Sequence, residues 1–80
     1  MTAPHGRALF EAVVERTGLA SFIGPGAVER ALESVGAAPD AATVDDYRRA
    51  LPQLRTRMAV YLKASELQEK LSALDALFRS

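Results

Sequence analysis

Residues 9–35 read LFEAVVERTGLASFIGPGAVERALESV, and the order of helical stripes and turn residues in this stretch decides the fold. Its first half carries an apolar stripe at the spacing of one helix face, formed by Leu9, Phe10, Val13 and Val14. Gly18 suits the left-handed residue that follows a helix, with Leu19 folding back onto Val14. With Pro4 in the first turn, the pattern predicts a helix over residues 4–17.

The second half of the stretch predicts another helix after a tight turn. Pro25 suits a first helical position, with Gly24 as the N-cap. Ile23 and Val28 then stand at the spacing of a hydrophobic staple. The apolar stripe continues through residues 28–35, and Gly36 favours a stop after it. We therefore expect a helix over residues 25–35.

A longer apolar stripe follows, at alternating spacings of three and four residues. It consists of Val44, Tyr47, Leu51, Leu54, Met58 and Tyr61. Thr43 and Asp46 have the spacing of a capping box, which indicates a helix start. Pro52 removes one helical hydrogen bond and disfavours helical geometry at Leu51. We therefore expect two helices, over residues 44–51 and 53–63.

A further capping-box pattern, Ser65 with Gln68, predicts a last helix over residues 66–79. Its expected core stripe is Leu67, Leu71, Leu74 and Phe78. The chain is thus expected to form an all-α, compact bundle of about five short helices (4–17, 25–35, 44–51, 53–63 and 66–79). Its 80 residues are enough for a single small helical domain, 1–80.

Composition excludes several classes of protein. The chain is 49% hydrophobic and has no Cys, so it is core-forming but offers neither a disulfide scaffold nor a thiolate metal site. No apolar run approaches the roughly 20 residues of a membrane span, and the first residues contain no signal core. We expect a cytoplasmic protein, and the preference for Arg and Ala is typical of bacterial GC-rich coding.

Residues that carry out chemistry are scarce. His5 is the only imidazole, close to the N-terminus, and no nucleophile has an evident base partner. The acidic pairs Glu11/Glu15 and Glu29/Glu33 indicate a solvated face, because a metal site needs more ligands. The Gly24-Pro25-Gly26 turn lacks the Lys of a phosphate-binding loop. We expect no catalytic residues, no metal, no cofactor and no enzymatic activity.

Charge is divided unevenly along this neutral chain. Residues 1–46 contain three Arg and seven Asp/Glu, a net charge of −4, and residues 47–80 contain seven Lys/Arg and three Asp/Glu, a net charge of +4. Either the two halves fold against each other, or copies associate head to tail through faces of opposite charge. The first interpretation is the favoured one, and head-to-tail association is the alternative.

Two groups of residues are candidates for binding a partner. Phe22 and Ile23 lie in a turn, where we expect them to pack inward as a staple, while the alternative is that one protrudes as an anchor. Tyr47 and Tyr61 suit contact with a partner at an exposed surface, because a phenol combines an apolar ring with a polar tip. Tyr47 with Arg48 or Arg49 would make an anchor pair. The alternative is a purely structural role, with Tyr47 at the edge of the core and its hydroxyl in water.

The remaining basic residues follow the helical register. In one straight helix, Arg48 and Arg55 would share a flank of the apolar stripe, while Arg49 and Arg57 would point elsewhere. The candidate partner-binding residues are Phe22, Ile23, Tyr47, Arg48, Arg49 and Arg55.

These observations favour a non-enzymatic protein–protein interaction or adaptor module, with self-association through opposite-charge faces. The alternative is a small helix-turn-helix DNA-binding regulator built on residues 28–51. Neutral overall charge argues against a nucleic-acid partner, since phosphate contacts dominate such affinity. Asp45 and Asp46 would also open the recognition helix where it would meet phosphates.

Overall fold

A computed structural model describes residues 5–79 and shows four α-helices and no strand in that range. They are α1 (Gly6–Thr17), α2 (Gly24–Glu33), α3 (Val44–Ala59) and α4 (Ala64–Arg79). The all-α prediction is confirmed, but the expected number of five helices is wrong. The helix start expected at Pro4 lies outside the described residues.

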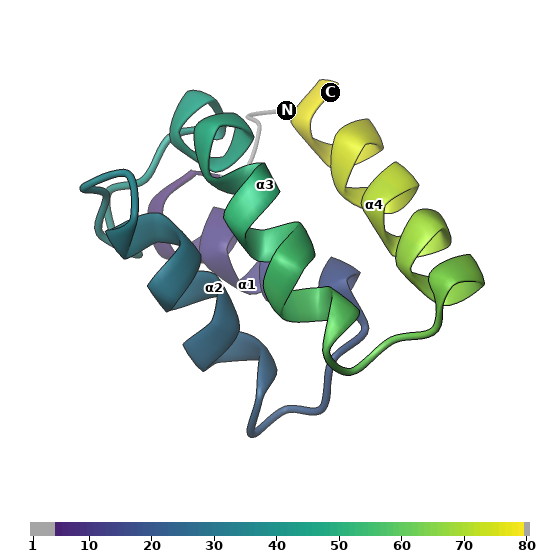
Figure 1. The fold of residues 1–80 in the computed structure, drawn as a ribbon. Coiled ribbons are helices and arrows are strands. Elements are labelled where there is room, and N and C mark those ends of the chain that lie inside the picture. Colours follow the sequence, from purple (N-terminus) through teal and green to yellow (C-terminus); the bar gives the residue numbers. More distant parts are fainter. Residues whose placement is uncertain (1–4, 80) are drawn as a thin grey trace.

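The four helices form a ring around one core (Figure 1). α1 packs against α2 and α4, and α3 packs against the same two helices from the other side. The buried cluster draws side chains from every helix: Leu9, Phe10, Val13, Val28, Ala31, Leu32, Tyr47, Ala50, Leu54, Met58, Leu74 and Phe78, with Ala42 from the connector. The predicted stripes therefore do face one another.

The expected break at Pro52 does not occur, because α3 runs through it. Pro52 has no N–H to donate to the carbonyl of Arg48, which costs roughly 3 kcal/mol in a helix interior. Burying a large apolar side chain contributes about 1.5–3 kcal/mol, and Tyr47, Leu54 and Met58 are all buried. A continuous helix keeps these residues, on both sides of Pro52, on one face. Packing thus outweighs the local penalty.

Two of the predicted helix boundaries are confirmed in detail. Gly18 adopts φ +69° and donates its N–H to the carbonyl of Glu15, so it ends α1 as expected. The capping box of α3 is also present: Thr43 N–H donates to Asp46 Oδ2 at 2.9 Å, and Asp46 N–H donates to Thr43 Oγ1 at 3.2 Å. The bond from Thr43 N–H, followed by that from Arg49, lowers the pKa of Asp46.

Other boundaries differ from the prediction. α2 begins at Gly24 with Ile23 as its N-cap, and it ends at Glu33 instead of residue 35. α4 begins at Ala64, so Ser65 lies inside the helix and does not cap it. Lys63 N–H instead donates to Glu66 Oε1 at 3.4 Å. Glu66, three residues after Lys63, was therefore a better signal for the start of α4 than the Ser65–Gln68 pattern.

Candidate functional site

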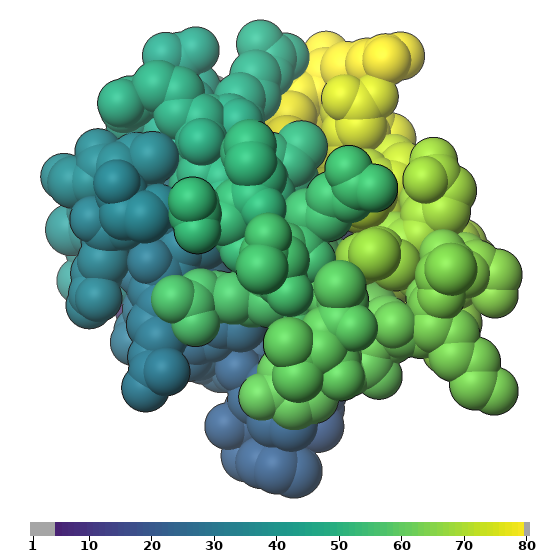
Figure 2. All heavy atoms as spheres, in the orientation of Figure 1, coloured from purple at the N-terminus to yellow at the C-terminus, as the bar shows by residue number. Residues whose placement is uncertain are grey.

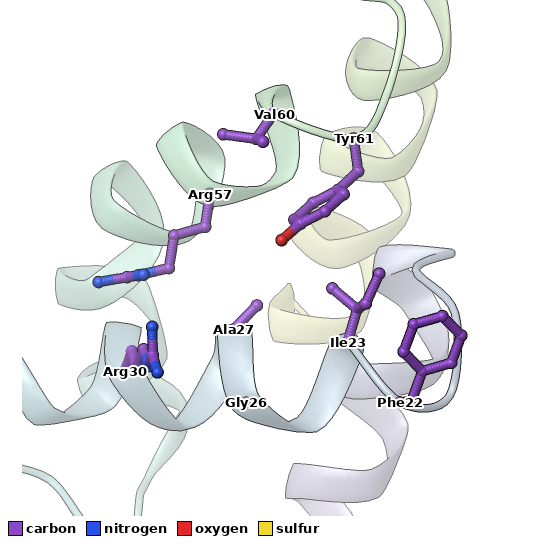
Figure 3. Close-up of a pocket in the computed structure, with 8 residues that line it drawn as sticks. All are labelled: Phe22, Ile23, Gly26, Ala27, Arg30, Arg57, Val60 and Tyr61. Atoms are coloured by element: carbon purple, nitrogen blue, oxygen red, sulfur yellow. The ribbon is translucent and has the colours of Figure 1, made fainter.

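One surface feature is a gathering of exposed apolar side chains around a hollow. The large hydrophobic residues exposed in the described chain are Phe22 (86%), Val60 (75%) and Tyr61 (55%). All three line a hollow of about 280 Å³, together with Ile23, Gly26, Ala27, Arg30 and Arg57 (Figure 3). We name it the Phe22–Tyr61 hollow.

Hydrogen-bonded turns hold both walls of this hollow. On one wall, the N–H groups of Ile23 and Gly24 donate to the carbonyl of Ala20 at 2.9 and 2.8 Å. On the other, Tyr61 N–H donates to the carbonyl of Met58 at 3.0 Å as α3 ends. Met58 is fully buried, so Tyr61 is anchored to the core through its backbone while its ring stays exposed.

The ring of Tyr61 and the side chain of Ile23 face each other on one side of the hollow (Figure 3). Phe22 lies at the rim, beyond Ile23. The expectation that Phe22 packs inward is therefore wrong. Ile23 is half-buried and lines the hollow, and the apolar residue of this segment that packs against the core is Leu19.

Two guanidinium groups occupy the other side of the hollow. Arg30 comes from α2 and Arg57 from the last turn of α3. Neither forms an ion pair within residues 5–79, where the ion pairs are Arg7–Asp40, Arg49–Asp46 and Arg79–Asp75. The Nε of Arg57 is buried and has no hydrogen-bond partner among the described residues.

A second, wider concavity lies between α3 and α4. This groove has a volume of about 750 Å³ and is lined by Arg48, Leu51, Pro52, Arg55, Thr56, Ala59, Leu67 and Leu71. Figure 2 views the face on which α3, in green, meets α4, in yellow-green. Leu67 and Leu71, expected in the core stripe of the last helix, are half-buried: they pack against the core cluster and also form the α4 wall of the groove.

The six residues predicted to bind a partner do not form one surface. Phe22 and Ile23 line the hollow, whereas Arg48 and Arg55 line the groove. Arg48 also donates to the carbonyl of Phe78 at 2.9 Å, which ties α3 to the end of α4. Arg49 pairs with Asp46 at the start of α3 and lines neither concavity.

Tyr47 lies in the core, so neither surface interpretation of this residue is correct. It is 1% exposed, and its ring stacks on Phe78 with 5.8 Å between centroids. Its hydroxyl has no hydrogen-bond partner among the described residues. Burial raises the pKa of Tyr47 to about 12.

Of the eight residues that line the hollow, sequence reasoning gave only Phe22 and Ile23 as candidates, and the missed side chains include Arg30, Arg57, Val60 and Tyr61. Arg30 carried no signal, since a lone Arg on a helix resembles ordinary solvation. Arg57 and Tyr61 were noticed but set aside in favour of residues earlier in α3. The position of Val60 and Tyr61 was a signal of exposure. They follow the last residue of α3, so no further helical turn covers their apolar side chains.

Among residues 5–79 no group of three or more His, Cys, Asp or Glu side chains is arranged to hold a metal ion. In the segment considered as a helix-turn-helix, residues 34–43 separate α2 from α3. The Asp46 carboxylate accepts a hydrogen bond from Thr43 N–H and pairs with Arg49. The helix-turn-helix alternative stays a prediction.

Within the described part of the chain, every helix is too short or too polar to cross a bilayer.

Comparisons of the chain with protein-family models, with curated proteins and with solved structures found no match.

Proposed function

We propose that this chain is a non-enzymatic protein–protein interaction module that binds a partner through the Phe22–Tyr61 hollow. The observation that carries the proposal is the gathering of Phe22, Val60 and Tyr61 around one concavity. Scattered exposed apolar residues are ordinary, but a contiguous patch rimmed by polar groups is typical of an interaction site.

The composition of the hollow supports a protein partner. Aromatic residues and Arg are enriched at protein interfaces, and Phe22, Tyr61, Arg30 and Arg57 bring both kinds together. Tyr61 offers a rigid apolar ring with a polar tip, which orders at little entropic cost. Hydrocarbon and guanidinium groups suit recognition better than bond making, for which a positioned acid or base is needed.

Self-association is a second part of the proposal. The negative half and the positive half of the chain meet in only one ion pair among the described residues, Asp46–Arg49, and that pair is local to α3. Folding the halves together therefore leaves most of these charges without an oppositely charged partner from the other half, within the described residues. Opposite charges that are not paired within one copy can steer two copies together.

The partner-binding part is tested by affinity capture from the native host followed by quantitative mass spectrometry. We expect Phe22→Ala/Tyr61→Ala to lose proteins that the wild type retains, without a change in Tm, since both side chains are exposed. The matched control is Gln53→Ala/Gln68→Ala, which changes two exposed, uncharged residues outside both concavities. If both double variants capture the same proteins as the wild type, the proposal is wrong.

A further inference from the structure

We infer that the Phe22–Tyr61 hollow binds an acidic partner segment in which a carboxylate stands next to a large apolar side chain. The carboxylate would sit on Arg57 and Arg30, and the apolar side chain would contact Ile23, Val60 and Tyr61. This inference rests on the proposed function and adds the chemistry that the partner must present.

Charge is the first argument. Arg30 and Arg57 reach the same hollow from two different helices, and neither has an acidic partner within residues 5–79 (Figure 3). Two guanidinium groups on one concave surface repel each other, and a carboxylate between them would turn that repulsion into attraction. Charge-assisted bonds from Arg to a carboxylate are among the strongest hydrogen bonds in proteins.

The burial of Arg57 is the second argument. Its Nε is shielded from solvent without an acceptor among the described residues, so its donor capacity is not fully used. The side chain is half-buried, which restricts its stem before a ligand arrives. A partly desolvated and positioned cation gains more from an anion than a freely solvated one.

Helix stability alone does not account for the two arginines. Each lies in the last turn of its helix, where a cation is favoured by the helix dipole. That effect favours a basic residue in the last turn of each helix. It does not require both side chains to line one concavity with exposed apolar residues.

The apolar wall distinguishes a peptide segment from a free anion. Inorganic phosphate would use the two arginines and leave Ile23, Val60 and Tyr61 uncovered. At about 280 Å³ the hollow is below the roughly 300–1,000 Å³ of sites for drug-sized molecules. It therefore matches one or two side chains of a segment whose remaining residues lie outside.

The binding chemistry is tested with small probes and the whole chain. N-acetyl-leucine presents a carboxylate beside an apolar side chain, N-acetyl-leucinamide lacks the charge, and inorganic phosphate lacks the apolar part. Isotope-labelled protein is titrated with each probe while the Arg Nε–Hε and the Ile and Val methyl NMR signals are followed. We expect saturable shifts at Arg57, Arg30, Ile23 and Val60 with N-acetyl-leucine, and at least about tenfold weaker binding of the other two probes.

Variants tie the effect to the hollow. Arg57→Gln should abolish the shifts caused by N-acetyl-leucine, whereas Arg55→Gln, the same change on the groove side of α3, should leave them intact. A structural role for Arg57 would alter Tm but not distinguish the acid from the amide. The inference is overturned by equal binding of acid and amide, by phosphate binding as tightly as N-acetyl-leucine, or by no saturable shift.

The partner-capture experiment separates this inference from the proposed function. Loss of partner in both Phe22→Ala/Tyr61→Ala and Arg57→Gln, with retention in Arg55→Gln, supports both. If the double variant loses the partner while Arg57→Gln keeps it, the hollow is an interaction site but the carboxylate requirement is wrong. If no variant loses a partner, the proposed function itself fails.

Discussion

The hydroxyl of Tyr47 is a polar group placed in the core without an acceptor among the described residues, while its ring stacks on Phe78. Removing the hydroxyl therefore removes a desolvation cost and leaves the ring contact in place. We expect Tyr47→Phe to leave the free energy of unfolding at neutral pH unchanged or to raise it by up to about 1 kcal/mol. Urea denaturation measures the difference, with Tyr61→Phe as the exposed control.

The same substitution should change how stability depends on alkaline pH. Because burial raises the pKa of Tyr47 from 10.0 to about 12, the unfolded chain releases this proton at lower pH than the folded chain. Ionisation of this phenol therefore leaves the free energy of unfolding of the wild type unaffected below about pH 10 and lowers it as the pH rises through about 12. The advantage of Tyr47→Phe over the wild type should grow across this range. A constant difference would contradict the burial of the hydroxyl.

At the same residue scale, helical spacing predicted which side chains share a face but not which of them are covered. Tyr47 and Tyr61 belong to one stripe, yet Phe78 covers Tyr47, whereas Tyr61 follows the last residue of α3. Covering depends on a residue 31 positions away in the chain, as Phe78 is from Tyr47. Sequence reasoning without contacts between distant residues could not separate the two tyrosines.

At the scale of the element, α3 carries a proline in its interior at an exposed position. Pro52→Ala supplies the missing N–H for the carbonyl of Arg48 and loses little packing. We expect the free energy of unfolding to rise by about 1–2 kcal/mol, somewhat below the full interior penalty because proline also restricts the unfolded chain. Chemical denaturation measures this change, and Gln53→Ala, at the adjacent exposed position, should change stability by less than about 0.5 kcal/mol.

A loss of stability in Pro52→Ala would contradict this account of α3. It would mean that the helix needs the geometry imposed by proline. Because Pro52 and Leu51 both line the groove between α3 and α4, such a result would indicate that Pro52 affects the packing of α4 at this groove.

Element boundaries show why local rules succeeded in some places and failed in others. Gly18 and the Thr43–Asp46 box act through their own backbone neighbours, so their sequence signals were sufficient. Pro52 failed as a signal because burial of side chains on both sides of it outweighs one lost hydrogen bond. For the Phe22–Tyr61 hollow, sequence reasoning identified Phe22 and Ile23 as candidates but not their neighbours across the hollow, because the hollow joins a turn before α2 to a turn after α3.

For the whole molecule, the division of charge makes a prediction about association. Residues 1–46 carry −4 and residues 47–80 carry +4, and the described ion pairs neutralise little of this between the halves. If copies associate through these charges, association should be strongest at low salt and weaken as the Debye length falls from about 10 Å at 0.1 M to 3 Å at 1 M. Sedimentation at several protein and salt concentrations measures this dependence.

Salt also separates the two ways in which copies could meet. Association through the apolar side chains of the Phe22–Tyr61 hollow would persist or strengthen with excluded salts such as sulfate, because these favour apolar burial. Glu29→Gln/Glu33→Gln, which removes two exposed charges of α2, should weaken charge-driven association several-fold, while Gln53→Ala/Gln68→Ala should not. A protein that stays monomeric at high concentration in low salt would contradict charge-driven association. The opposite charges would then only be solvated surface charges of a single chain.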